Sequence, residues 1–309
     1  MQNVLVTGGA GYIGAVVVDD LLRSGFKVTV IDRFSRGNIS LMQHCHFPEL
    51  SFFAGDVRDE KLMKKHIKSA DFIISLAALV SPKACENQED LAIDINIKSI
   101  DLLNSLRADS QPLFFISTNI GYGTQSKISC YDESSPLEPN SIYGKTKVAA
   151  ESIVSRRGEY IIFRPASAYG ISPAMKNHLL LHYYVSRAVA EGALVVYEPE
   201  AIRNFIHVRD ISRAILHCMK NYNEMKNNIF NLGSSNSNLT KREIVELIRE
   251  SLPTLYTHFA EISQDPDNRN YLVSNEKIEN SGFICKYSLK DGISELIKYY
   301  KLLKQVTRE

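Results

Sequence analysis

Two kinds of hydrophobic pattern alternate along the first half of the chain. Short runs of consecutive apolar residues are typical of strands buried on both faces of a sheet, and apolar residues that repeat every three or four positions are typical of helices. An alternation of the two predicts an α/β fold built on a doubly wound parallel sheet. The predicted strands are 4–6, 27–32, 51–57, 72–78 and 113–118, and the predicted helices are 15–24, 60–68, 89–108 and 144–157.

The strict alternation ends near residue 170. We expect a first domain over residues 1–170, to which a segment around 204–233 returns, and a smaller C-terminal lobe over residues 171–309. In the second half, Thr240-Lys241-Arg242-Glu243 predicts a capping box that opens a helix, and Asp210 predicts the N-cap of another helix.

Three glycines punctuate the turn after the first predicted strand. Gly8, Gly11 and Gly14 precede a helix, and glycine there lets the backbone turn tightly and approach the pyrophosphate of a dinucleotide. Asp32 ends the second strand, where a carboxylate can accept hydrogen bonds from an adenosine ribose and repels a 2′-phosphate. The neighbouring Arg33 weakens that preference slightly. The pattern therefore predicts a Rossmann-type domain that binds NAD rather than NADP.

The ends of the other predicted strands carry residues that suit the same site. Parallel strands bring their carboxyl ends to one edge of the sheet, where ligands bind. Asp56 ends the third strand, Ala77 and Ala78 leave room at the end of the fourth, and Thr118 ends the fifth. We therefore expect one ligand site along this edge.

A tyrosine and a lysine are candidates for acid–base chemistry. Tyr143 and Lys147 are four residues apart, so they share one helical face if Tyr143 lies in the first turn of a helix. A phenol has a pKa of about 10, and a nearby ammonium favours its phenolate form, which can take a proton from an alcohol. A tyrosine and a lysine at this spacing also occur by chance in many helices. The glycine turn earlier in the chain makes a catalytic role for this pair more convincing.

Composition argues against several other classes of function. With 36 Lys and Arg against 35 Asp and Glu, we expect neither nucleic acid nor a membrane as the main partner. The five cysteines form no C-x-x-C pair, and His178 and His182 have no third ligand nearby, so we predict neither a disulfide framework nor a metal site. The chain shows no signal peptide and no membrane-spanning run, which predicts a cytoplasmic protein.

Taken together, these motifs resemble the extended short-chain dehydrogenases/reductases, and within them the nucleotide-sugar epimerase/dehydratase group. The resemblance covers nearly the whole chain. Its other segments are Gly55-Asp56-Val57, Leu76-Ala77-Ala78, Ser117-Thr118, Arg164-Pro165, Arg203 to Asp210 and Phe230 to Gly233. Three further segments are most similar to GDP-manno-heptose 4-dehydrogenase-like members: Gly170 to Pro173, Asn238 to Arg242 and Asp265 to Ser274.

The resemblance implies a role for each matching residue. Tyr143 would be the base on a sugar hydroxyl, Lys147 would bind the nicotinamide ribose, and Thr118 would orient the hydroxyl. The implied cofactor-binding residues are Gly8, Gly11, Tyr12, Ile13, Gly14, Asp32, Arg33, Asp56, Val57, Leu76, Ala77, Ala78, Tyr143, Lys147 and Pro165. The implied substrate-binding residues are Thr118, Asn119, Ser167, Asn177, His178, Arg203 and Arg269, the two arginines for the diphosphate. A homodimer through helices 89–108 and 144–157 is also implied.

Three departures from the family pattern bear on the reaction and on the placement of the substrate. The dehydratases carry Asp and Glu after the catalytic Ser or Thr, whereas this chain has Asn119 and Ile120, which supply neither an acid nor a base. Dehydration is therefore not expected. The usual Asn after Arg-Pro-x is Ser167, and the usual Asp after Arg203 is Asn204, so the placement of the substrate is less well defined than that of the cofactor.

These observations predict an NAD-dependent oxidoreductase that acts at C4 of a sugar nucleotide, GDP-linked by the narrower resemblance, with UDP also possible. Its 4-keto product is either released, as in a GDP-heptose 4-dehydrogenase of surface-polysaccharide biosynthesis, or reduced again on the other face, as in a UDP-glucose 4-epimerase. A 4-keto reductase uses the same residues in the opposite direction. A non-catalytic NAD-binding redox sensor would not need the intact set of Thr118, Tyr143 and Lys147.

Overall fold

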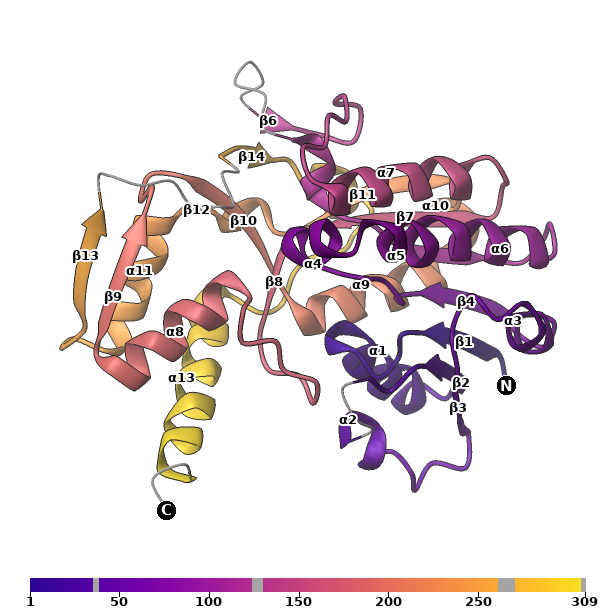
Figure 1. Ribbon diagram of the computed structural model, residues 1–309, viewed down its shortest axis with the longest axis horizontal. Helices are drawn as coiled ribbons and strands as arrows, with labels where there is room; N and C mark the ends of the chain where they lie inside the picture. Colours follow the sequence, from indigo (N-terminus) through magenta and orange to yellow (C-terminus); the bar gives the residue numbers. More distant parts are fainter. Residues whose placement is uncertain (36–38, 124–129, 261–269, 307–309) are drawn as a thin grey trace.

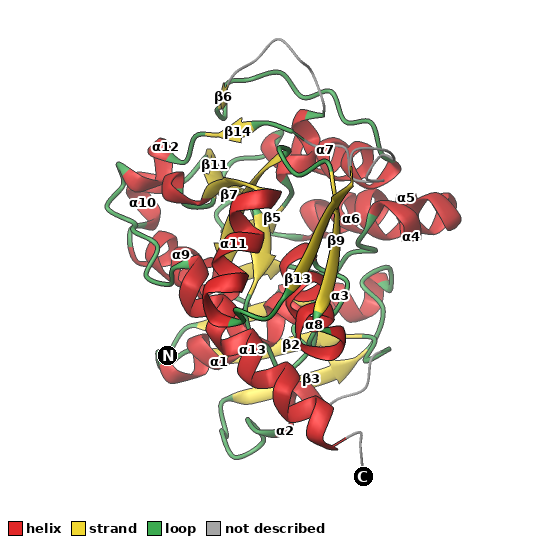
Figure 2. Cartoon of the chain, turned by 90° about the vertical axis from the view of Figure 1, so that its left-hand side faces the viewer, coloured by secondary structure: helices red, strands yellow, loops and turns green. Residues whose placement is uncertain are grey.

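The computed structural model describes residues 1–35, 39–123, 130–260 and 270–306. Figure 1 shows a large sheet with helices on both faces, and beside it a smaller lobe that contains β9, β13, α8, α11 and α13. Figure 2 shows the same chain from the side of this lobe. In the described part of the chain, no helix is long and apolar enough to cross a membrane.

The large sheet has seven strands in the described residues, in the order β11-β7-β5-β4-β1-β2-β3, and each of its pairings is parallel. The predicted doubly wound α/β fold is therefore confirmed. The strands are β1 (Asn3–Thr7), β2 (Lys27–Asp32), β3 (Leu50–Ala54), β4 (Phe72–Ser75), β5 (Leu113–Ile116), β7 (Tyr160–Pro165) and β11 (Asn228–Leu232).

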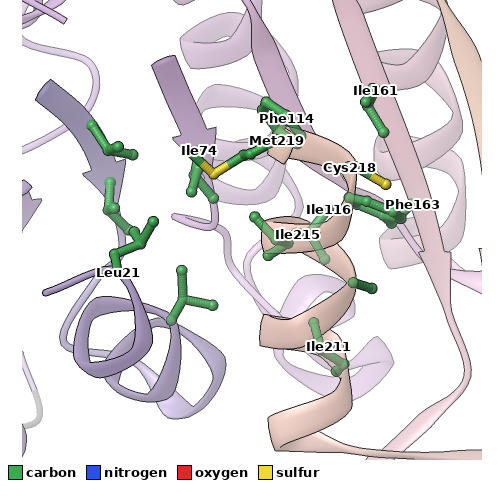
Figure 3. Close-up of a cluster of buried hydrophobic side chains, with 14 of the residues drawn as sticks. Leu21, Ile74, Phe114, Ile116, Ile161, Phe163, Ile211, Ile215, Cys218 and Met219 are labelled. Atoms are coloured by element: carbon green, nitrogen blue, oxygen red, sulfur yellow. The ribbon is translucent and has the colours of Figure 1, made fainter. Parts of the chain in front are cut away.

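Both faces of the sheet are covered because its strands are apolar on both sides. Val4 and Val6 of β1 pack in a cluster with α1 (Tyr12–Arg23) and α9 (Val208–Lys220), and Leu5 belongs to a second cluster on the other side. Figure 3 shows the first cluster, where Ile211, Ile215 and Cys218 of α9 point at the strands. Fully burying one such aliphatic side chain contributes about 1.5–3 kcal/mol.

Buried residues of α3, α6 and α7 cover the second face of the sheet. The predicted helix over 89–108 is divided by a π-helical turn, η1, which brings Asn96 into the interior. The helices on this side are α3 (Glu60–Ile67), α4 (Pro82–Asn87), α5 (Glu89–Ile93), η1 (Asp94–Lys98), α6 (Ser99–Leu106) and α7 (Ile142–Ser155).

The smaller lobe has its own core, formed by α8, α11, α13 and β9 together with Tyr169 and Phe205. The predicted capping box is confirmed, because the Thr240 hydroxyl and the Glu243 carboxylate each accept the other's backbone N–H. The lobe elements are α8 (Leu180–Glu191), β9 (Ala193–Tyr197), α11 (Lys241–Ser251), β13 (Tyr256–Ala260) and α13 (Leu289–Val306).

Shorter elements join the two parts. Parallel β8 and β10, with antiparallel β12, form a three-stranded sheet between the large sheet and the lobe, and α9 and β11 then return the chain to the large sheet. The bounds are β8 (Ser167–Tyr169), β10 (Ile202–His207), β12 (Asn238–Thr240), β6 (Cys130–Tyr131), β14 (Leu272–Val273), α2 (Ile39–Met42), η2 (Asn119–Tyr122), α10 (Tyr222–Met225), η3 (Ser235–Ser237) and α12 (Glu276–Glu279).

The predicted N-cap of α9 is wrong. His207 is the N-cap, and its ring nitrogen accepts the Arg209 N–H at 3.1 Å. Asp210 lies in the first helical turn, where its buried carboxylate accepts the backbone N–H groups of Lys286 and Tyr287 at 3.0 Å each. Asp210 therefore fastens the segment before α13 to α9, a partner that is distant in sequence.

Candidate functional site

A cavity of about 620 Å³ follows the carboxyl ends of the parallel strands and continues to the start of α8. All fifteen residues that we expected at the cofactor line it, from Gly8 to Pro165. Four of the expected substrate residues also line it, namely Thr118, Asn119, Ser167 and His178. The cavity thus brings together residues from six strand ends, α7 and the segment before α8.

Two of the expected substrate residues, both in the described part of the chain, do not line the cavity. Asn177 lies on the surface, and its side-chain oxygen accepts a hydrogen bond from the Tyr300 hydroxyl at 3.0 Å. Arg203 is buried in β10 and donates to the Ile202 carbonyl at 3.0 Å. Arg269 lies outside the described residues.

The glycine turn, Thr7 to Gly14, fits a dinucleotide. Gly8 has φ +75°, and a Cβ on it would lie 2.6 Å from the Ala77 nitrogen. A Cβ on Gly14 would lie 2.3 Å from the Gly8 carbonyl oxygen. Only glycine therefore allows the turn to fold back on itself. The first-turn residues of α1, Tyr12 to Gly14, line the cavity, and their N–H groups, which helical geometry leaves without intrahelical partners, could donate to a pyrophosphate.

Two carboxylates stand at the adenosine end of the cavity. Asp32 is fixed because its oxygens accept the Ala10 N–H at 3.0 Å and the Phe34 N–H at 2.8 Å. Asp56 forms a two-point ion pair with Arg58, with bonds of 2.9 and 2.8 Å, and the Arg58 hydrogen bonds hold the pKa of Asp56 below its usual range. Asp56 thus remains an anionic acceptor at neutral pH.

The helix α7 carries the predicted tyrosine and lysine. Its N-cap is Ser141, whose hydroxyl accepts the Gly144 N–H at 3.1 Å. Tyr143 and Lys147 follow on the same face, and both line the cavity. A Cβ on Gly144 would lie 2.9 Å from the Pro139 side chain, so a glycine lets the start of the helix approach the preceding loop.

The ammonium of Lys147 lies in an apolar place. The side chain is 3% exposed, and Nζ stands 4.0 Å from the centre of the Phe115 ring. Burial lowers the pKa of Lys147 to about 7, and the negative charge of Glu151 partly opposes this shift. Near neutrality Lys147 can therefore exchange a proton, and a negative group bound beside it would favour its charged form.

A buried polar network behind the cavity was not predicted from the sequence. Glu151, one turn after Lys147, accepts two hydrogen bonds from Arg164 at 3.1 and 2.8 Å and another from the Ser117 hydroxyl. Arg164 also donates to the Tyr122 hydroxyl at 3.1 Å. Since Ser117 precedes Thr118, the network fixes α7 against the end of β5. An acid on the apolar face of a predicted helix is the signal that could have revealed it.

Asn96 was also missed. It is 1% exposed, and its side-chain oxygen accepts the Leu79 N–H at 2.8 Å. Its side-chain nitrogen donates to the Leu79 carbonyl at 3.0 Å and to the Thr146 hydroxyl at 3.1 Å. The same hydroxyl donates to the Tyr143 carbonyl at 2.9 Å. Asn96 thereby holds the cavity-lining loop after β4 to the helix of Tyr143, and π turns often occur at such functional positions. An amide within the apolar stripe of helix 89–108 could have indicated it.

Comparison with known proteins gives a consistent result for this site. Residues 4–233 match the NAD dependent epimerase/dehydratase family. The chain belongs to this family. It is 30% identical over 272 residues to the UDP-glucose 4-epimerase of Corynebacterium glutamicum, an alignment that covers 81% of this chain and 80% of the relative.

Solved structures agree in fold. The UDP-glucose 4-epimerase of Thermotoga maritima, solved with UDP-glucose, superposes with a TM-score of 0.85 at 24% identity and covers all of both chains. The dTDP-glucose 4,6-dehydratase of Bacillus anthracis, solved in complex with NAD, gives a TM-score of 0.84 at 25% identity over 99% of this chain and 98% of that one.

Membership makes this chain an NAD-dependent enzyme of the nucleotide-sugar epimerase/dehydratase family. The expected cofactor, NAD, is thus confirmed at the level of the family, and the glycine turn and Asp32 fit it. The narrower expectation of a GDP-heptose dehydrogenase is not supported, because the relatives named above are UDP-glucose 4-epimerases and a dTDP-glucose dehydratase.

Proposed function

We propose that this protein is an NAD-dependent 4-epimerase of a nucleotide-activated sugar, with a UDP-sugar as the first candidate substrate. One observation carries the proposal. The cavity wall contains Thr118, Tyr143 and Lys147, yet the only carboxylates among its described lining residues are Asp32 and Asp56, at the adenosine end. Oxidation of an alcohol needs the first three residues, whereas expulsion of water would need a carboxylate beside them.

The residues suggest a simple division of labour. The Thr118 hydroxyl accepts the Ile120 N–H at 3.2 Å, which sets its orientation and leaves its own proton to donate to the C4 oxygen. Tyr143 takes the proton of the C4 hydroxyl and later returns it. Lys147 would hold the ribose of the cofactor and stabilise the phenolate. NAD, held by the glycine turn and Asp32, would supply a reversible hydride acceptor for C4. Holding both reactants in one cavity provides much of the rate by orientation.

Epimerisation requires the 4-keto sugar to turn over before the hydride returns. Ser167 stands where the family has Asn, and it lines the cavity with a shorter side chain. The shorter side chain leaves the sugar more room in the cavity. Release of the 4-keto sugar is the second candidate, favoured by the GDP-heptose-type segments such as Gly170 to Pro173. A 4-keto reductase would run the same chemistry in reverse.

Mass spectrometry separates these functions. The purified protein is incubated with UDP-glucose, GDP-mannose or GDP-heptose in 18O-labelled water. A product of unchanged mass with a new retention time establishes an epimerase. A product two mass units lighter that exchanges one oxygen with solvent establishes a released 4-keto sugar and rejects the epimerase. If no substrate reacts although NAD is bound, the proposed substrate is wrong, and only the assignment of the cofactor stands.

The proposed homodimer through α5, α6 and α7 is tested separately. α6 and α7 pack together through the Asn104 amide, which donates to the Ile153 carbonyl at 3.0 Å. Light scattering of the purified protein should give twice the 34.8 kDa mass of one chain. A monomeric mass at working concentration rejects this interface.

A further inference from the structure

Beyond the strand ends, the cavity is also lined by side chains of the segment 170–183, which we call the substrate wall. Lys176, His178 and Tyr183 of this segment line the cavity. The segment connects β8 to α8 and has little regular structure of its own before Leu180. Its position must therefore be set by side chains from other elements.

The glycine turn supplies the central contact. Tyr12 is 3% exposed, and its hydroxyl donates to the Gly170 carbonyl at 2.8 Å across 158 residues of sequence. The Tyr12 carbonyl accepts a hydrogen bond from the Ser172 hydroxyl at 2.7 Å. The ring of Tyr12 also belongs to a small apolar cluster against which Met175 and Leu179 pack. One residue of the turn thus touches the substrate wall at three points.

His182 completes this contact from the other side. Its Nε2 accepts the Gly170 N–H at 3.1 Å, so the proton of the neutral ring is on Nδ1, which donates to the Lys176 carbonyl at 2.9 Å. Burial lowers the pKa of His182 to about 4, so the ring stays neutral near pH 7. Glu295 of α13 accepts the Ile171 N–H at 2.8 Å. Side chains from other elements therefore bind the backbone of the substrate wall at both Gly170 and Ile171.

We propose that Tyr12 is a positioning residue that couples NAD binding on the glycine turn to the order of the substrate wall. The backbone of Tyr12 begins α1, where the pyrophosphate would bind, and its side chain ends on Gly170. A ligand that restrains the turn restrains Gly170 and Ser172 as well, so the sugar nucleotide loses less conformational entropy when it binds second. By linkage, the sugar nucleotide strengthens NAD binding by the same factor.

Hydrogen exchange followed by mass spectrometry tests this coupling without any turnover. Saturating NAD should slow amide exchange in peptides that cover residues 170–182 of the wild-type protein, in addition to those of the glycine turn. In Tyr12→Phe the turn should still be protected by NAD, and the protection of residues 170–182 should be clearly reduced, because the bond to the Gly170 carbonyl is gone. The coupling is rejected if NAD leaves residues 170–182 unchanged in the wild type, or if Tyr12→Phe transmits the protection in full.

A matched control separates coupling from simple loss of stability. Tyr169 is the neighbour of Gly170, is 1% exposed, and donates to the Tyr287 carbonyl at 3.2 Å within the lobe. Tyr169→Phe removes an equivalent buried hydroxyl that does not touch the glycine turn, so it should transmit the NAD protection as the wild type does. Should Tyr12→Phe fold poorly, Ser172→Ala removes one of the three contacts and should weaken the transmission partly. Full transmission in Ser172→Ala would count against the proposal.

Calorimetry gives the size of the effect. The affinity for UDP is measured with and without saturating NAD, and the ratio is the coupling factor. Loss of one buried hydrogen bond should lower this factor about fivefold in Tyr12→Phe. An unchanged factor rejects the proposal. If UDP does not bind at all, the proposed nucleotide is wrong, and the exchange experiment with NAD alone still decides the coupling.

Discussion

The cofactor side of the cavity is held by backbone geometry at strand ends, whereas the substrate wall is held by side chains that come from distant elements. On the cofactor side, Gly8, Asp32 and Ala77 each lie within a few residues of a strand of the large sheet. On the other side, Gly170 depends on Tyr12 and His182 for both of its backbone groups. The first side is thus preorganised by the sheet, and the second depends on contacts that bound ligands can strengthen.

The chemistry lies where the two sides meet, and the largest effect is expected there. Tyr143→Phe should lower turnover about 10³-fold, because it removes the general base. The affinity for NAD should change little, as calorimetry can show. Tyr256→Phe, which removes a hydroxyl from an exposed ring of β13 that does not line the cavity, is the matched control and should keep most of the activity. A Tyr143→Phe enzyme with full turnover would reject both C4 mechanisms.

A change confined to the cofactor side should weaken the binding of NAD and leave the binding of UDP intact. In Gly14→Ala the new Cβ would meet the Gly8 carbonyl oxygen at 2.3 Å. Overpacking of about 1–3 kcal/mol corresponds at its upper end to about 100-fold weaker NAD binding. UDP affinity without NAD should be retained. Gly158→Ala, where the new Cβ would lie 3.7 Å from the Asn227 side-chain oxygen, is the control. Equal loss of UDP affinity would show that the two sides are not separate.

The buried ammonium makes a prediction about stability and pH. The pKa of Lys147 falls to about 7 in the folded protein, so the unfolded chain binds more protons between pH 7 and the usual lysine pKa of about 10.4. The cost of burying the charge is thus fully present below pH 7 and is lost as the pH rises through that window. Without NAD, Lys147→Met should be more stable than the wild type at pH 6, by on the order of 2 kcal/mol.

Thermal unfolding across pH measures this difference. The gain from Lys147→Met should shrink steadily as the pH approaches 10. Lys145→Met, at an exposed position in the same helix, should show no such dependence. A gain that grows with pH would mean that Lys147 is charged and well stabilised in the folded protein.

The smallest effect concerns the choice of dinucleotide. Asp32→Asn keeps an oxygen that can accept the Ala10 or Phe34 N–H, and it removes the charge that repels a 2′-phosphate. The ratio of NADP to NAD affinity should rise on the order of tenfold, equivalent to about 1.4 kcal/mol of repulsion. Arg33, which also lines the cavity, would favour the phosphate. An unchanged ratio would mean that residues other than Asp32 discriminate between NAD and NADP.

The difference between the two sides of the cavity also explains which site residues could be predicted from the sequence and which could not. The glycine turn, Asp32, Thr118 and the Tyr143–Lys147 pair follow from local patterns, because a strand end fixes the direction of the next few residues. The roles of Asn96 and Glu151 depend on a π turn and on a buried arginine, and no local pattern specifies those contacts. The bond from Tyr12 to Gly170 spans 158 residues, so it could be found only after folding. Asp210 was wrongly predicted for the same reason.

The late return of the chain to the large sheet has a consequence for folding during synthesis. β11, which covers the edge of β7, and α9, which covers one face of the sheet, both come after β8, β9 and α8 in sequence. A chain that ends at residue 170 would leave β7 as an open edge and would expose the face where Ile211 and Ile215 pack, a state prone to aggregation. We expect the sheet to become stable only when residue 232 has left the ribosome, so the two parts mature together.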